Sequence, residues 1–259
     1  MRAVLSSEWL KIRSVRSTYL ILCLGLSTVL IGLTIALAAA GTYDAVSPEQ
    51  QAGARIADLE EVLIVVPQLC MGILGILVIT SEYATGLIRT SLALVPRRWP
   101  VLMAKATVVG ALSLLVGALA VFGTYLVAGS VLGERFSGAY TAAFEDRLPL
   151  LITLTLTVPT FALLGLGLGA LLRSAAAATA IVVGLVYVIP IIINNVPEPW
   201  SERLGSLMIS ALPRQITGDL ITTSVYGSLL PPPVAAAVMV GYAFIPLVIA
   251  TWLIRQKDA

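Results

Sequence analysis

The sequence predicts an all-α integral membrane protein with six transmembrane helices. Hydrophobic residues make up 58% of the chain and charged residues only 12%, and the mean hydropathy is +0.98. These values lie far outside the range of soluble globular proteins. Six tracts without charge are each long enough to cross a bilayer. They cover residues 19–40, 62–80, 106–128, 148–172, 175–193 and 234–254 of a single transmembrane domain, 1–259.

The charged residues predict the orientation of these spans. Six spans place both termini on one side of the membrane. The connections on that side carry eleven basic and three acidic residues, a net charge of +8, whereas the other side carries five basic and eleven acidic residues, a net charge of −6. Lys and Arg accumulate in cytoplasmic loops. We therefore expect a multi-pass protein of the plasma (cell inner) membrane with both termini in the cytoplasm.

Residues 1–18 precede the first span and interleave apolar with basic side chains, among them Trp9, Ile12, Lys11 and Arg13. This pattern is typical of an amphipathic helix that lies along the inner leaflet and leads into the first span as an elbow. A cleaved signal peptide is the alternative, because residues 38–41 resemble a cleavage site. The apolar run of 22 residues is longer than the usual signal core, and five more spans follow.

The loop 41–61 is rich in acids and turn formers, and its last four residues, 58–61, could open the second span at its outer end. We expect the loop to be solvated without a recognisable site. The second span follows it and contains two unusual residues, Pro67 and Gln68. Pro removes a helical hydrogen bond, and Gln brings an amide into the apolar layer. They form either a hinge with a polar spot on a translocation path or a tolerated kink with an interhelical hydrogen bond. We favour the second interpretation.

Residues 81–95 follow the second span and are too polar for lipid but periodic enough for a helix. A hydroxyl of Thr80 or Ser81 is a suitable N-cap, and Glu82 places a carboxylate at the positive end of the helix dipole. The segment closes with Pro96, Arg97 and Arg98. We expect a short helix at the membrane face with a cationic turn behind it. The spacing of the residues is also compatible with an alternative, a helix that lies at the membrane interface and contacts only lipid headgroups.

The later spans contain small and polar residues at helical spacing. Thr153 and Thr157 share one face of the fourth span, and Gly165 and Gly169 form a small-xxx-small surface suited to close helix packing. The surrounding GLGLG is not a nucleotide loop, because no strand precedes it. Candidate residues of a translocation path are Gln68, Thr153, Thr157 and Asn194.

Residues 196–233 form a long connection between the fifth and sixth spans. Apolar residues recur at helical spacing in it, and prolines interrupt it. A connection of this length usually has a role. We expect one or two short helices folded back onto the outer leaflet, where they either gate an exit or shield the helix ends.

The chain has no chemistry typical of an enzyme. It contains no His, and Cys23 and Cys70 are single residues in different spans, so neither a metal site nor a disulfide is indicated. No serine has a candidate base partner, and no GxxxxGK[ST] loop is present to bind ATP. The spans hold no ionisable group that an ion-driven transporter needs. Any uphill transport must therefore take its energy from a partner.

Two stretches carry a resemblance to a known family. The start SEWLKIRSVRSTY, the six-span layout and the segment SEYATGLIRTSLALVPRRWPVLMAK resemble the permease subunits of type 2 ATP-binding-cassette (ABC) transporters. In that family the segment after the second span is the coupling helix, which docks in a cleft of a separate ATPase subunit. The resemblance assigns this ATPase-coupling interface to Glu82, Tyr83, Gly86, Arg89, Thr90, Pro96, Arg97 and Arg98, followed by Lys105.

The resemblance implies an exporter built from two permease chains, identical or different, and two ATPase subunits that bind ATP and Mg. This chain itself would bind no cofactor, and membrane lipid but no nucleic acid would be its other partner. Spans without charges favour an amphipathic, lipid-like, drug (multidrug or antibiotic) or peptide cargo. One alternative is a membrane anchor or assembly subunit for an ATPase-like partner. Another is an unrelated membrane enzyme or channel, which the lack of clustered catalytic or pore-lining groups disfavours.

Overall fold

The computed structural model describes residues 2–85, 99–138, 140–218 and 230–256, and within these ranges its regular elements are helical. Six helices in the described part are long and apolar enough to cross a membrane. The predicted all-α class with six spans is therefore confirmed. The candidate spans are Arg16–Ala45, Leu59–Ala84, Pro100–Leu132, Phe144–Leu172, Ala175–Asn194 and Pro232–Leu253.

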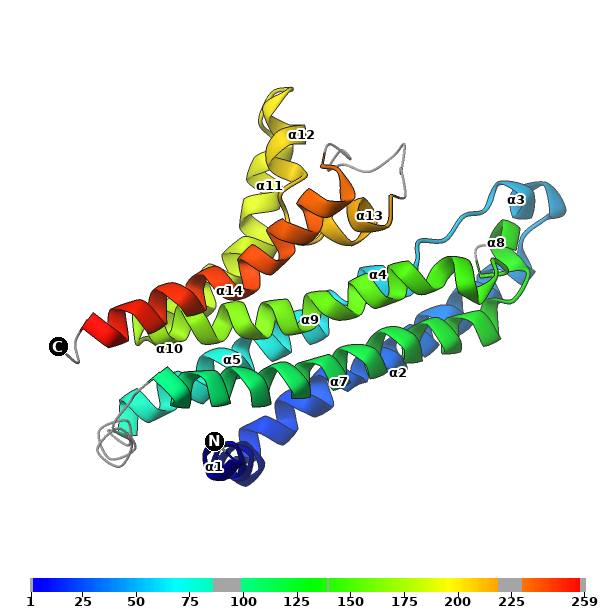
Figure 1. Ribbon diagram of the computed structural model, residues 1–259. Coiled ribbons are helices and arrows are strands. Elements are labelled where there is room, and N and C mark those ends of the chain that lie inside the picture. The colour runs from blue at the N-terminus through cyan, green and yellow to red at the C-terminus, as the bar shows by residue number, and fades with distance from the viewer. Residues whose placement is uncertain (1, 86–98, 139, 219–229, 257–259) are drawn as a thin grey trace.

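The chain begins with α1 (Arg2–Ser14), which meets α2 (Arg16–Ala45) at the extended residue Val15. α1 lies across the end of the bundle and contacts both α2 and α7 (Trp99–Leu132). The N-terminus and the end of α14 (Pro232–Gln256) lie at the same end of the molecule, whereas α3 (Pro48–Gly53) and α8 (Arg135–Gly138) lie at the opposite end (Figure 1). A helix therefore occupies the place where an elbow was expected.

The second span consists of α4 (Leu59–Leu63) and α5 (Val65–Thr85). The helix breaks around Ile64, because Pro67 has no N–H to donate to the carbonyl of Leu63. At its other end α5 continues past Thr80, whose hydroxyl donates to the carbonyl of Ile76 within the same helix (2.9 Å). The expectation that Thr80 or Ser81 caps a new helix is therefore wrong. The helix runs on because Glu82 and Tyr83 still have partners in the bundle.

The centre of the bundle is α9 (Phe144–Leu172), which packs extensively against α5, α7 and α14. The glycines of α9 allow its backbone to approach the neighbouring helix α5 closely. A Cβ on Gly165 would lie 2.1 Å from the carbonyl oxygen of Gly72 on α5, and one on Gly169 would lie 2.7 Å from a methyl group of Ile79. The predicted small-xxx-small surface is therefore a contact within the chain, and it fixes α5 tightly against α9.

The remaining helices fold back on this core. Arg173, in the left-handed conformation (φ 53°), makes the short turn from α9 to α10 (Ala175–Val183). The fifth span continues through the π-helix η1 (Gly184–Val188) and α11 (Ile189–Asn194). Two short helices follow, α12 (Trp200–Gly205) and α13 (Leu212–Thr217), and α13 packs against α9 and α14. Short helices are thus present where a folded-back segment was expected.

Candidate functional site

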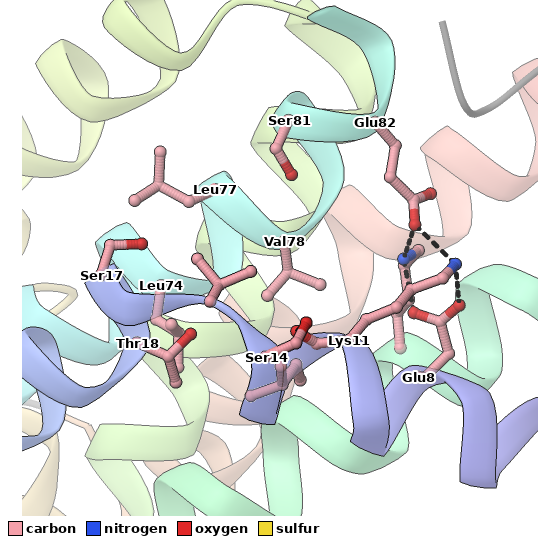
Figure 2. A pocket seen from close by; sticks show the side chains of 13 residues that line it. Glu8, Lys11, Ser14, Ser17, Thr18, Leu74, Leu77, Val78, Ser81 and Glu82 are labelled. Carbon is pink, nitrogen blue, oxygen red and sulfur yellow. Dashed lines mark hydrogen bonds and ion pairs between the residues drawn. The ribbon is translucent and has the colours of Figure 1, made fainter. Parts of the chain in front are cut away.

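Four charged side chains meet where α1, α5 and α7 converge, and we call them the elbow cluster: Glu8, Lys11, Glu82 and Lys105. The ammonium group of Lys105 lies 2.5 Å from Oε2 of Glu8 and 2.7 Å from Oε1 of Glu82. Lys11 contacts Oε1 of each glutamate, at 2.8 Å and 2.9 Å. Figure 2 shows that the glutamates converge on the two ammonium groups from opposite sides. Each carboxylate thus bridges two lysines.

The elbow cluster is almost completely enclosed. Lys105 is 1% exposed, Glu8 2% and Glu82 6%, while the side chain of Lys11 reaches the surface. Buried charges are tolerated only when they are paired and hydrogen-bonded, and two glutamates with two lysines balance to zero. Burial lowers the pKa of Lys11, but its hydrogen bonds to Glu8 and Glu82 outweigh this and hold the pKa above its ordinary value. The cluster therefore ties α1 to the adjoining ends of α5 and α7.

Glu82 and Tyr83 are the two predicted coupling residues that the structure describes. Glu82 points into the elbow cluster. The ring of Tyr83 lies under the guanidinium of Arg173, 5.4 Å from its centroid, at the turn between α9 and α10. Lys105 is also internal. The other predicted interface residues lie outside the described residues: Gly86, Arg89, Thr90, Pro96, Arg97 and Arg98.

A cavity of about 390 Å³ adjoins the elbow cluster, between α1, the first turn of α2 and α5. We call it the elbow cavity. Glu8, Lys11, Glu82 and Lys105 line one end of it. Apolar and hydroxyl side chains line the rest: Ile12, Val15, Leu74, Leu77, Val78, Ser14, Ser17, Thr18 and Ser81. In Figure 2, Leu74, Leu77 and Thr18 lie away from the charged end. The cavity therefore has a charged end and a mainly apolar body.

The four candidate path residues do not form one site. Gln68 donates from Nε2 to the hydroxyl of Thr157 (2.7 Å), and both residues are buried between α5 and α9. Thr153 bonds to carbonyls of its own helix, and Asn194 is exposed at the end of α11. The Gln68 contact agrees with the interpretation as an interhelical hydrogen bond.

A second charged group lies at the opposite end of the bundle, and we call it the distal cluster: Asp58, Glu60, Glu61, Arg147 and Arg214. Arg214 on α13 lies 2.7 Å from Asp58 and donates from Nε to Glu61 at 2.8 Å and 2.9 Å. Arg147 on α9 lies 3.1 Å from Asp58. The expectation that loop 41–61 is merely solvated is therefore wrong in its last residues, because these acids hold α13 and α9 to the start of α4.

Tyr140 completes this arrangement. Its hydroxyl donates to Oε2 of Glu60 (3.0 Å) and accepts from the backbone N–H of Leu59 (2.9 Å). Burial and the negative charge of Glu60 raise the pKa of Tyr140 well above its ordinary value. Glu60 is 1% exposed, and its Oε1 has no hydrogen-bond partner within the described part of the chain.

Sequence reasoning missed both clusters as units. Glu8 and Lys11 are three residues apart on one helix face, which is a local signal for one of the ion pairs. The contacts of Glu8 with Lys105 and of Arg214 with Asp58 join residues 97 and 156 positions apart, and no local pattern encodes them. In the described ranges, no group of three His, Cys, Asp or Glu residues is placed to hold a metal ion.

Comparison with known proteins identifies the family. The family model described as "ABC-2 family transporter protein" matches residues 4–259, nearly the whole chain. No curated protein matches the chain at the level that we required.

Proposed function

The chain belongs to the ABC-2 family of transporter proteins, and on this premise we propose that it is an exporter permease coupled to ATP hydrolysis through residues 81–95. The family makes it a multi-pass membrane subunit of an ABC transporter, a kind of subunit that is generally not catalytic. A separate ABC ATPase supplies the energy. Export of an amphipathic, lipid-like, drug or peptide cargo is the finer part of the proposal, and it follows from uncharged spans and from the family resemblance.

One observation carries the coupling proposal: the helices on both sides of the segment are joined to each other. α5 ends at Thr85 and α7 begins at Trp99. The 2.7 Å ion pair between Glu82 and Lys105 connects the two helices close to these ends. A displacement of residues 86–98 by a docked ATPase would therefore move α5 and α7 together.

The helix α5 transmits such a displacement into the bundle. Backbone contacts at Gly72, Gly75 and Gly165 hold it against α9, so neither helix can slide past the other without breaking close packing. ATP binding would close the ATPase pair, push the coupling segment and switch the spans between two arrangements, and hydrolysis would reset them.

The proposed orientation places the elbow cluster and both termini in the cytoplasm. The distribution of basic residues supports it. We further propose that two permease chains form the pathway between them, as the family resemblance implies. ATP and Mg would bind to the ATPase subunits. A membrane anchor without its own transport remains the second candidate function, and it predicts ATP hydrolysis that no cargo stimulates.

The test is co-expression of the chain with an ABC ATPase encoded beside it, followed by purification in detergent. The ATPase should co-purify with the wild type, and Arg89→Ala should weaken this association or uncouple hydrolysis. Arg55→Ala is the matched control, because Arg55 is an exposed arginine at the opposite end of the bundle. Loss of association in both variants, or no association of the wild type, would contradict the coupling proposal.

Transport is tested separately in inside-out membrane vesicles. ATP should drive uptake of a short-chain fluorescent phospholipid or an amphipathic dye into vesicles that contain both subunits. A complex that hydrolyses ATP, shows no uptake and is not stimulated by either probe would favour the anchor function.

A further inference from the structure

We propose that the elbow cavity binds one acyl chain of an anionic phospholipid, whose headgroup lies on Arg13 and Arg16. This site goes beyond the coupling role, and only the assignment to the inner leaflet rests on the proposed orientation. Membrane contact along α1 follows from its amphipathic sequence. A defined lipid site does not, because it requires a cavity that only the fold creates.

The size and lining of the cavity suit an acyl chain. Its volume of about 390 Å³ falls in the range of about 300–1,000 Å³ found for small-molecule sites. Ile12, Leu74, Leu77 and Val78 give it apolar walls from α1 and α5, and Ser17 and Thr18 add hydroxyl groups from the start of α2. Small-molecule sites are typically lined by apolar side chains, with a few polar groups that fix the orientation of the ligand.

The charges around the cavity select an anionic headgroup. The elbow cluster is neutral, and each of its lysines already contacts both glutamates, so it offers no free charge. Arg13 and Arg16 lie in the turn that contributes Ser14, Val15 and Ser17 to the cavity wall. Both arginines are exposed, and neither forms an ion pair with any residue that the structure describes. Exposed basic residues beside a membrane attract anionic lipids.

The surroundings of the turn place it at headgroup level. Trp9 and Leu10 on α1 are 49% and 63% exposed, and Tyr19 and Leu20 on α2 are 49% and 66% exposed. Aromatic residues favour the membrane interface, and an exposed leucine favours acyl chains. The two arginines lie between these apolar pairs in the sequence. A lipid with its headgroup at the turn therefore has its acyl chains beside the cavity.

Such a lipid would also support the elbow cluster. The charged end of the cavity is the cluster itself, so a chain in the cavity would fill the space between α1 and α5 next to Lys11 and Glu82. Occupancy would hold α1 against α5 and exclude water from the ion pairs.

Native mass spectrometry of the detergent-purified chain tests the binding. Palmitoyl-oleoyl phosphatidylglycerol should bind more tightly than the matching phosphatidylcholine. Each arginine removed should weaken phosphatidylglycerol binding by about fivefold, so Arg13→Gln/Arg16→Gln should lose most of the preference. Arg55→Gln, at the opposite end of the bundle, is the control and should bind like the wild type. Inorganic phosphate should not compete at similar concentrations, which separates a lipid from a free anion.

The position of the acyl chain needs a second measurement. Phosphatidylglycerol with a photoreactive group in one acyl chain should label peptides that contain Leu74, Leu77 or Val78. Ser17→Phe, which fills the cavity from an exposed position, and Leu77→Trp should each reduce this labelling. The proposal is wrong if the label appears only on lipid-facing residues such as Leu20, if Arg55→Gln weakens binding as much as the double variant, or if phosphate competes as well as lipid.

Discussion

The elbow cluster and the distal cluster occupy opposite ends of the same bundle and differ in burial and in charge balance. The elbow cluster has two acids and two lysines, and three of its four members are at most 6% exposed. The distal cluster has three acids and two arginines, and the side chains that contact Arg214 are 13% and 27% exposed. A buried, balanced cluster is difficult to open, whereas a partly solvated one can exchange its partners for water.

The two ends of the second span therefore have charge contacts of different kinds. Its two ends carry Glu60 and Glu61 at the distal cluster and Glu82 at the elbow cluster, while close contacts with α9 hold the middle. At the elbow end, buried ion pairs join α5 to α1 and α7. The distal end holds α13, which belongs to the folded-back segment, through bonds that water can replace. The second span is therefore held by buried ion pairs at one end and by partly solvated ones at the other.

Removing a lysine from the elbow cluster should have the largest effect. Lys105→Met leaves Glu8 and Glu82 buried beside a single lysine, and loss of one partner of a buried pair costs about 3–5 kcal/mol. We expect the free energy of unfolding in mixed detergent micelles, measured by SDS titration, to fall by this amount. The triple variant Glu8→Gln/Glu82→Gln/Lys105→Met should recover part of the loss. An effect below about 1 kcal/mol would mean that the cluster is solvated.

Arg214→Gln should have a smaller effect, because the distal cluster is partly open. It removes hydrogen bonds to Asp58 and Glu61, and a hydrogen bond to a charged group contributes about 1.5–3 kcal/mol. The same SDS titration measures the change. Arg135→Gln is the control, since its pair with Asp44 is exposed on both sides, and no measurable change is expected for it. If Arg214→Gln destabilises as much as Lys105→Met, the contrast between the clusters is wrong.

Gln68→Leu tests the region between the two clusters. It removes the 2.7 Å hydrogen bond to Thr157, and such bonds within membranes contribute about 0.6 kcal/mol on average and up to about 1.7. We expect a loss in this range with ATP-driven uptake unchanged. A loss of transport at normal stability would instead place Gln68 on the translocation path.

The smallest effect concerns pH and Lys11. Because Glu8 and Glu82 hold the pKa of Lys11 above the ordinary value of 10.5, the folded state binds this proton more tightly than the unfolded state. The stability gained from it is fully present below about pH 10.5 and is lost as pH rises through the folded-state pKa. The stability difference between wild type and Lys11→Gln should therefore stay constant from about pH 7 to about pH 9.5 and shrink only above that. A change of this stability difference below about pH 9.5 would contradict the conclusion that Glu8 and Glu82 raise the pKa of Lys11.

Much of this protein was predictable from local patterns. Uncharged tracts predict six spans because a bilayer excludes charge over a fixed length. The glycines at 165 and 169 predict a close helix contact, and Gln68 predicts an interhelical hydrogen bond, because a lone amide in an apolar helix needs a partner. Each of these predictions follows from the residues of one helix in an apolar solvent, whereas the partner residues on the neighbouring helix did not follow from them.

The tertiary structure decided which residues meet. Glu82 looks like a surface carboxylate at a helix start, yet it is buried in α5 because lysines from α1 and α7 reach it. Asp58 and Glu61 look like solvated acids where a span opens, yet Arg214 reaches them from α13. These pairs join positions 23 to 156 residues apart, and Coulomb attraction depends on distance in space and not along the chain. The sequence therefore determined the spans, and only the packing of those spans determined the two clusters and the elbow cavity.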